Sequence, residues 1–278
     1  MQKLLICTDL DRTLLPNGEP PESSGARSTF ARFVALPSVF LAYVSGRHLG
    51  LVQQSMQEYG LPDPDWIIGD VGSSIYHRDL DGWSLLTSWS SCISVDWQGL
   101  VAADIAPLFT GFGGLLLQPE EKQNTYKLSY FIPLDVDLIA LKQAMESCLE
   151  ANNISASLIY SVDEQAAVGL MDVLPQRANK LHAIEFLMRE QGFASEQTLF
   201  AGDSGNDLAV LTSSVPSVLV ANAHRDVVDQ AIEAAQRMGT GDRLYLAEGG
   251  FRGMNGNYSA GILEGIAHFH ADAIRELD

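Results

Sequence analysis

The sequence predicts an α/β protein whose parallel-sheet core is interrupted by an inserted α+β segment. Short apolar runs alternate with helical patterns at both ends of the chain, which is typical of a parallel sheet. The middle third differs, because polarity alternates there along a predicted strand, as on a half-exposed antiparallel sheet. In addition, three short polar signatures each follow an apolar run, where an open α/β sheet places its ligand crevice.

The first third of the chain begins the core. Strands are predicted from bounded apolar runs at residues 3–8, 39–44 and 66–68. A helix is expected at residues 26–36. A second is expected at 48–59, where apolar residues recur at helical spacing and Gly60 supplies a stop. Strand, helix, strand, helix and strand in this order indicate a parallel sheet.

The middle third, from about residue 84 to 175, is predicted to be a small α+β domain. Strand candidates stand at residues 115–118, 126–132 and 157–161. Residues 137–151 form a helical pattern with their apolar side chains on one face. An insert of this kind is a natural lid over a ligand crevice.

The last third resumes the alternation of strands and helices. Strands are predicted at residues 198–201, 217–220 and 244–246. Helices are predicted at residues 181–191, 207–211, 226–238 and 258–269. We therefore expect a discontinuous core domain, residues 1–83 and 176–278, and one inserted domain, residues 84–175.

Composition limits the partners. The 278 residues are 46% hydrophobic and 19% charged, as in an ordinary globular protein. The net charge is 17 − 35 = −18, and the isoelectric point is near 4.5. Such a surface repels nucleic acid and anionic lipid, so we expect neither nucleic acid nor a membrane as a partner. An anionic substrate must then be held by a locally positive site, which means a metal ion and a few cationic side chains.

The three cysteines are far apart and show no C-x-x-C spacing, which indicates thiols of a reducing compartment. The N-terminus leads directly into a predicted strand, without the pattern of a signal peptide. No apolar stretch approaches the roughly 18 residues that span a bilayer. The expected location is therefore cytoplasmic.

The first polar signature is Asp9-Leu10-Asp11-Arg12-Thr13, after the first predicted strand. Residues two apart on an extended segment point the same way, so both carboxylates could face one reacting group. An ionised aspartate can attack phosphorus, and a second aspartate can transfer the proton of the leaving group. A solvated turn or a simple cation site would show the same pattern.

The second signature, Ser45-Gly46-Arg47, follows the next predicted strand and precedes a helix. A hydroxyl and backbone N–H groups at a helix start suit phosphate oxygens, and Arg47 adds a clamp for phosphate or substrate. Lys180, where the core pattern resumes, is expected to close the phosphate site. Taken singly, each of these residues also fits an ordinary turn or a solvated charge at a helix start.

The last signature is Gly-Asp-Ser-Gly-Asn-Asp at residues 202–207. Asp203 and Asp207 offer carboxylates and Asn206 offers a side-chain carbonyl, without clustered histidine or cysteine ligands. Oxygen ligands suit a hard cation, so the prediction is Mg²⁺ and not Zn²⁺. An acidic loop that caps a helix is the alternative, and it fits Asp207 better than it fits the whole segment.

Taken together and in this order, the signatures resemble those of the haloacid-dehalogenase-like phosphatases. The resemblance implies a Rossmann-like core. It also implies that the α+β insert is a cap that selects the substrate, as in the subgroup that acts on sugar phosphates. Four further segments are similar to sucrose-phosphate phosphatases and mannosylfructose-phosphate phosphatases, namely residues 69–77, 126–130, 172–180 and 260–266.

The resemblance also implies roles for single residues. Asp9 would be the nucleophile, and Asp11 would act first as an acid and then as a base. Mg²⁺ would be held by Asp9, the carbonyl of Asp11, Asp203 and Asp207, with Asn206 and Asp207 supporting Asp203. The transferring phosphoryl group would be held by Ser45, Gly46 and Lys180. The substrate would be contacted by Arg47, Asn206 and, from the cap, Lys127.

The substrate that the resemblance implies is a disaccharide phosphate such as sucrose 6-phosphate. Sucrose phosphatases usually carry a glutamate at the position of Ser74, so a mannosylfructose phosphate or another glycosyl phosphate fits as well. A sugar phosphomutase would share the signatures. A non-catalytic regulatory partner of a glycosyltransferase is disfavoured, because both Asp9 and Asp11 are present. A sugar-phosphate synthase is the expected protein partner.

Overall fold

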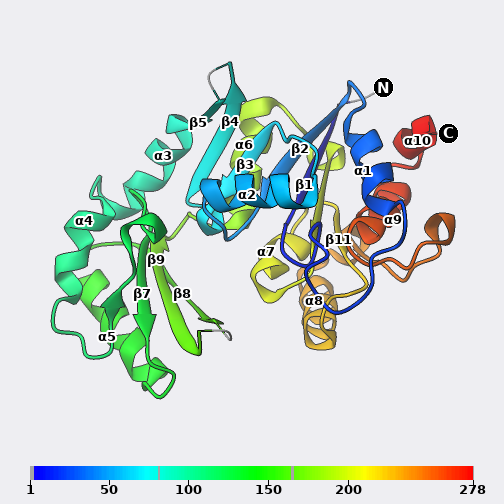
Figure 1. The fold of residues 1–278 in the computed structure, drawn as a ribbon. Helices are drawn as coiled ribbons and strands as arrows, with labels where there is room; N and C mark the ends of the chain where they lie inside the picture. The colour runs from blue at the N-terminus through cyan, green and yellow to red at the C-terminus, as the bar shows by residue number, and fades with distance from the viewer. Residues whose placement is uncertain (1–2, 81, 164–165, 278) are drawn as a thin grey trace. The chain divides into compact units, whose positions relative to one another are not determined.

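Two compact units make up the protein, whose computed structural model describes residues 3–80, 82–163 and 166–277 (Figure 1). The core unit joins the two ends of the chain, Met1–Leu85 and Lys180–Asp278. The inserted unit is the segment between them, Leu86–Asn179.

The core unit is built on one eight-stranded sheet in the order β12-β11-β10-β1-β2-β3-β4-β5. Its strands are β1 Leu4–Thr8, β2 Val39–Val44, β3 Trp66–Gly69, β4 Ser74–Asp79, β5 Gly82–Leu85, β10 Thr198–Gly202, β11 Ser217–Leu219 and β12 Leu244–Leu246. Neighbours from β12 to β3 pair in parallel, and β4 and β5 extend the sheet as an antiparallel hairpin. The chain order reverses between β1 and β10, and such a switch point is where open α/β sheets bind their ligands.

Helices cover both faces of the central strands. The core helices are α1 Ala26–Val34, α2 Leu49–Tyr59, α6 Lys180–Gln191, α7 Leu208–Leu211, α8 Arg225–Met238, α9 Ser259–Phe269 and α10 Ala271–Ile274. Alternate residues of β1 point to opposite faces. Leu4 and Ile6 join a cluster with side chains of α1, α2 and α9, whereas Leu5 and Cys7 are buried outside that cluster. Helix α9 packs closely on β11 because Gly265 has no side chain. A Cβ at this position would lie only 2.6 Å from the Cβ of Val218.

The register of the central strands brings the polar signatures to one edge of the sheet. Thr8, the last residue of β1, lies beside Tyr43 of β2, and β10 pairs with β1 on its other side. The residues that follow these parallel strands therefore emerge at the same carboxyl edge, namely Asp9, Ser45 and Asp203.

The inserted unit combines a four-stranded antiparallel sheet with short helices. The sheet order is β6-β7-β9-β8, with β6 Leu116–Leu117, β7 Leu128–Ile132, β8 Ala156–Asp163 and β9 Val168–Pro175. The helices are α3 Thr87–Ser94, α4 Ala102–Ile105 and α5 Leu138–Ala151. Its own apolar core includes Trp97, Phe109, Tyr130, Met145 and Met171.

The predicted α/β class is confirmed, with a mostly parallel central sheet. The predicted core strands are present with almost the same boundaries, whereas the β4–β5 hairpin and β9 were not predicted. Polar residues such as His77 in β4 and Asp172 in β9 interrupt the apolar runs that mark a strand. No helix in the described part of the chain is long and apolar enough to span a membrane.

Candidate active site

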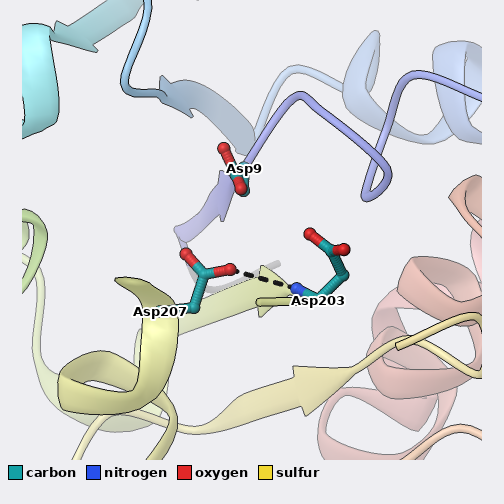
Figure 2. A group of neighbouring side chains, drawn as sticks. All are labelled: Asp9, Asp203 and Asp207. Atoms are coloured by element: carbon teal, nitrogen blue, oxygen red, sulfur yellow. Dashed lines mark hydrogen bonds between the residues drawn. The ribbon is translucent and has the colours of Figure 1, made fainter. Parts of the chain in front are cut away.

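Three carboxylates meet at the carboxyl edge of the core sheet (Figure 2). Asp9 follows β1, while Asp203 and Asp207 lie just after β10. One oxygen of each side chain lies within 4.8 Å of the other two, and all three residues are buried. Buried like charges repel one another, so these carboxylates can all be ionised only with cations beside them.

The turn after β10 is closed by Asp207 itself. Its Oδ2 accepts hydrogen bonds from the backbone N–H groups of Asp203 and Ser204, each at 3.1 Å. Gly202 permits this approach, because a Cβ there would lie 2.6 Å from the carboxylate carbon of Asp207. Asp207 therefore caps the short turn η6 Gly205–Asp207, which is the structural role that the alternative interpretation assigned to it.

Lys180, the first residue of α6, supplies a buried positive charge. Its Nζ lies 2.7 Å from Oδ1 of Asp207 and 3.2 Å from Oδ2 of Asp9, and it donates to Oδ1 of Asn206 at 2.9 Å. Burial alone would lower the pKa of Lys180. The charges of Asp207 and Asp9 outweigh burial and raise that pKa above its ordinary value, so the ammonium group stays charged.

Asp9 and Asp203 resist ionisation even though Lys180 is nearby. Burial raises the pKa of Asp9 to about 8, with Lys180 opposing the rise and Asp207 and Asp203 adding to it. Burial, followed by the charge of Asp207, raises the pKa of Asp203 to about 6. A cation placed among these oxygens would favour the ionised forms, so the site is suited to bind one.

The first and last signatures interlock through Asp203, which is 3% exposed. Its Oδ1 accepts a hydrogen bond from Oγ1 of Thr13 at 3.1 Å. The Nε of Arg12 lies 3.4 Å from its Oδ2. These contacts orient the carboxylate toward the loop that follows β1.

Asp11 pairs with a different cation. Nε of Arg47 donates to Oδ2 of Asp11 at 2.7 Å and Nη2 donates to Oδ1 at 2.5 Å, which makes a two-point ion pair. Burial alone would raise the pKa of Asp11, but hydrogen bonds and charge from Arg47, with help from Asn17, lower it. Because β1 ends at Thr8, Asp11 does not lie on an extended strand, and its carboxylate faces a different cation from that of Asp9.

The backbone of the second signature is held by the turn after β3. The N–H of Ser45 donates to the carbonyl of Ile68 at 2.8 Å, and the N–H of Val71 donates to the carbonyl of Ser45 at 3.2 Å. Asp70 also donates from its backbone to the carbonyl of Arg47 at 3.0 Å. Asp70 and Val71 have φ of 52° and 59°, which is the left-handed region. A β-branched residue such as Val71 rarely adopts this conformation.

A cavity of about 300 Å³ opens within the core unit at this edge. Its lining comprises Asp9, Asp11, Arg12, Gly46, Arg47, Leu51, Asp203, Ser204 and Asn206. The other predicted site residues of the core unit, Ser45, Lys180 and Asp207, are buried and do not line it. The structure thus brings nine predicted residues to one edge of the core unit.

Lys127 belongs to the inserted unit, just before β7. Its Nζ lies 4.0 Å from Oδ2 of Asp172 on β9, and Oγ of Ser129 donates to Oδ1 of the same carboxylate at 2.5 Å. Ser129 stands opposite Asp172 in the strand register. We call Lys127, Ser129 and Asp172 the polar cluster of the inserted unit. It offers donors and acceptors of the kind that bind sugar hydroxyls.

The sequence interpretation missed several supporting residues. Asn17 donates from Nδ2 to Oδ1 of Asp11 at 2.7 Å, and its Asn-Gly pair with Gly18 was the signal of a turn. Asn222, whose Nδ2 donates to the carbonyl of Arg12 at 2.6 Å, was missed as well, as was the turn at Asp70 and Val71, and the sequence carries no signal for their partners. Such contacts join distant parts of the chain, and local patterns do not encode them.

A buried aspartate after the first strand, a buried lysine against it and two acidic residues after the neighbouring strand characterise the haloacid-dehalogenase-like phosphatases. A comparison with protein families identifies a narrower group within these phosphatases. Residues 2–270 match sucrose-6F-phosphate phosphohydrolase, so the chain belongs to that family. This confirms the family that the motifs indicated.

The similar proteins agree with this assignment. A protein of Nitrosococcus oceani, named only as a HAD-like hydrolase, is 52% identical over 268 residues, covering 96% of this chain and 72% of its own. The mannosylfructose-phosphate phosphatase of Agrobacterium fabrum is 30% identical over 232 residues, covering 82% of this chain and 86% of its own. The sucrose-phosphatase of Synechocystis sp. PCC6803, solved with sucrose and phosphate, has a TM-score of 0.71 and 27% identity, and the match covers 97% of this chain and 98% of that one. Together these findings support a sugar-phosphate phosphatase.

Proposed function

We propose that the protein hydrolyses the phosphate ester of a disaccharide, with Mg²⁺ and through an aspartyl-phosphate on Asp9. The observation that carries this proposal is the setting of Asp9. It is 4% exposed, lies against Lys180 and two further carboxylates, and lines an open cavity. Membership of the sucrose-6F-phosphate phosphohydrolase family favours sucrose 6-phosphate as the substrate, and the Agrobacterium relative favours a mannosylfructose phosphate.

The proposed reaction has two displacement steps at phosphorus. In the first, an oxygen of Asp9 bonds to phosphorus while the bond to the sugar oxygen breaks, and Asp11 gives that oxygen a proton. In the second, the ionised Asp11 takes a proton from water, whose oxygen attacks phosphorus and releases Asp9 and inorganic phosphate. Proton transfer by a positioned side chain contributes about 10²–10⁴-fold in rate. The pair with Arg47 favours the ionised form of Asp11 that the second step uses.

The carboxylate group fits Mg²⁺ by its chemistry and spacing. Its donors are all oxygens, which are the ligands that Mg²⁺ prefers, and one oxygen of each side chain lies within 4.8 Å of the other two. Asp9 and Asp203 are the proposed carboxylate ligands, together with the carbonyl of Asp11. Both oxygens of Asp207 already accept hydrogen bonds, so we propose that Asp207 supports the site by orienting Lys180 and the loop after β10. Bound Mg²⁺ would supply the positive charge that keeps Asp9 ionised at neutral pH.

Three groups are proposed to hold the transferring phosphoryl group: the Ser45 hydroxyl, the Gly46 N–H and the Lys180 ammonium. In support, Gly46 lines the cavity and Lys180 contacts Asp9. Arg47 and Asn206 also line the cavity and are proposed to contact the substrate beside the phosphate.

The inserted unit is proposed to select the sugar through its polar cluster. Buried polar groups that lose their partners when a wrong ligand binds can discriminate by several powers of ten. In the core unit, the buried Ser74 stands where sucrose phosphatases usually have glutamate. If this position contributes to selection, Ser74→Glu should raise kcat/KM for sucrose 6-phosphate relative to a mannosylfructose phosphate. The proposed protein partner is the synthase that makes the substrate, because ester hydrolysis would draw its reaction forward.

The test measures inorganic phosphate released from sucrose 6-phosphate, a mannosylfructose phosphate, monosaccharide phosphates and an aryl phosphate. We expect one disaccharide phosphate to be preferred, EDTA to stop the reaction, and Mg²⁺ rather than Zn²⁺ to restore it. Asp9→Asn should reduce phosphate release to background. The control Asp63→Asn, at an exposed ion pair of the same unit, should behave like the wild type. A fully active Asp9→Asn variant would contradict the mechanism, and dependence on a bisphosphorylated sugar activator would indicate a mutase instead.

A further inference from the structure

The loop after β1 turns sharply at Arg12, which lies between the proposed acid–base residue Asp11 and Thr13, the donor to Asp203. Arg12 has φ of 58°, in the left-handed region that residues with a Cβ adopt infrequently. Such a conformation persists only where surrounding contacts favour it, and it tends to occur at functional sites. The contacts that hold Arg12 in this conformation therefore help to decide where Asp11 lies.

Two asparagine side chains bind the two backbone polar groups of Arg12. The N–H of Arg12 donates to Oδ1 of Asn17 at 2.8 Å. On the other side, Nδ2 of Asn222 donates to the carbonyl of Arg12 at 2.6 Å, across 210 residues of sequence. The left-handed peptide is thus held from both sides by side-chain amides.

Asn222 is itself fixed at its other end. Its Oδ1 accepts a hydrogen bond from the N–H of Tyr258 at 2.8 Å, and only 7% of Asn222 is exposed, so water competes little for these bonds. Tyr258 is fully buried, and its hydroxyl donates to the carbonyl of Pro20, farther along the same loop, at 2.9 Å. Asn222 therefore ties the loop after β1 to the residue just before α9.

The turn at Arg12 sets the positions of three groups of the site. Asn17, which binds the N–H of Arg12, also donates to Oδ1 of Asp11. On the other side of the turn, Thr13 donates to Asp203, and the side chain of Arg12 itself lies near the same carboxylate. A change in the turn would move Asp11 relative to Asp203 without removing either.

We infer that Asn222 is a positioning residue for phosphoryl transfer: its amide holds the carbonyl of Arg12 so that Asp11 meets the leaving oxygen. This inference rests on the proposed phosphatase function. It assigns no contact between Asn222 and the substrate, since Asn222 does not line the cavity. The loss of the amide should therefore act on the chemical step through Asp11 and leave substrate binding nearly unchanged.

The experiment compares Asn222→Ala and Asn222→Asp with the wild type. The aspartate still accepts from Tyr258 but turns an oxygen in place of the donor toward the carbonyl of Arg12, so it breaks the inferred bond while keeping the other if the alanine variant fails to fold. With a sugar phosphate we expect kcat to fall about 100-fold with little change in KM, because a misplacement of about 1 Å has effects of this size. With an aryl phosphate, whose leaving group needs little protonation, the loss should be several-fold smaller.

A matched control variant, together with substitutions at Arg12, separates an effect on the position of Asp11 from a general loss of stability. Asn255→Ala removes a similar amide, which binds the carbonyl of Pro21 and not Arg12, and should leave kcat unchanged. Glycine adopts the left-handed conformation freely. Asn222→Ala should therefore lower kcat about tenfold in an Arg12→Gly background and about 100-fold in an Arg12→Ala background. Equal losses in the two backgrounds, or equal losses for sugar and aryl phosphates, would overturn the inference.

The controls also separate this inference from the proposed function. If the wild type releases phosphate, Asp9→Asn does not, and both Asn222 variants match the wild type, only the positioning role of Asn222 is wrong. If the wild type itself releases no phosphate from any substrate of the panel, the proposed function is wrong.

Discussion

The core unit and the inserted unit place their polar residues in contrasting ways. In the core unit, contacts such as that of Thr13 with Asp203 join residues 190 positions apart, at the ends of parallel strands. The charges there are deeply buried: Asp9, Asp203 and Lys180 are 4%, 3% and 2% exposed. Each carboxylate and cation in such a group depends on the others for its charge state.

In the inserted unit, the polar cluster arises from adjacent antiparallel strands, with Ser129 opposite Asp172 in register. Lys127 lies 4.0 Å from Asp172, a looser contact than the 2.7 Å between Lys180 and Asp207. The comparison teaches that the core residues act as one charge network, in which any loss should affect every substrate. In the polar cluster we expect each loss to act mainly on the preferred sugar phosphate, in keeping with the role proposed for the inserted unit.

The largest effect should follow the loss of the buried cation. We expect Lys180→Met to abolish phosphate release and to lower the free energy of unfolding by about 3–5 kcal/mol, since it leaves buried carboxylates without a counter-charge. Activity assays and urea unfolding at pH 8 would measure both. The matched change Lys142→Met, on α5 of the inserted unit, should alter neither by a comparable amount. A stable and active Lys180→Met variant would show that the charge network is not interdependent.

A smaller effect is expected at Asp11, which stands outside the network of three carboxylates. Asp11→Asn should lower kcat for a sugar phosphate by about 10²–10⁴-fold, because both proton transfers are lost. The loss for an aryl phosphate should be much smaller, since its leaving group departs without protonation. Steady-state assays of the two substrates in parallel would measure the difference. Equal losses for both would mean that Asp11 has a structural role.

The comparison predicts a selective effect in the inserted unit. Lys127→Ala should lower kcat/KM for the preferred disaccharide phosphate by about 10- to 100-fold, the size expected for one hydrogen bond from a charged group. The same variant should hydrolyse an aryl phosphate at nearly the wild-type rate, and Lys142→Ala serves as the control. If Lys127→Ala lowered both rates alike, the inserted unit would not be the part that recognises the sugar.

The smallest expected effect is on the pH dependence of Tm in the absence of metal. Because the pKa values of Asp9 and Asp203 are raised to about 8 and about 6, the folded protein binds more protons than the unfolded chain. The stabilisation from these protons is fully present below about pH 4 and is lost as pH rises to about 8. We therefore expect Tm in EDTA to fall across this range, and to fall less in the Asp9→Asn variant.

Mg²⁺ should reverse this trend, because it binds the ionised carboxylates of the folded state. At 100 times its Kd it would stabilise the fold by about 2.7 kcal/mol at pH 8, and by less at pH 5, where protons compete. Differential scanning calorimetry at the two pH values would measure the shift. An equal shift at both values would mean that Mg²⁺ binds elsewhere.

Much of the core unit could be predicted because its signals are local. Bounded apolar runs marked β1, β2 and β10, and the polar residues directly after them lie where the carboxyl edge of a parallel sheet requires. The hairpin β4–β5 and strand β9 could not be predicted in this way. Their polar residues are stabilised by pairing with neighbouring strands, and a single strand's pattern does not show its neighbours.

Likewise, some features of the site could be predicted from local signals and others could not. Asp9, Ser45 and Asp203 were predicted because each follows a strand, and Lys180 because the core pattern resumes there. The pairing of Asp11 with Arg47 was not predicted, since strand geometry was assumed to continue past Thr8. Backbone turns of this kind depend on long-range contacts that local propensity does not contain.

By itself, the sequence determined the α/β class, the order of the three polar signatures and Lys180, and the residue types of a phosphoryl-transfer site. Periodicity and spacing encode these features, because they act between residues close along the chain. Only the tertiary structure decided that Lys180 contacts both Asp9 and Asp207, and that Asn222 holds the carbonyl of Arg12. Those contacts depend on strand order and packing, which bring together residues up to 210 positions apart.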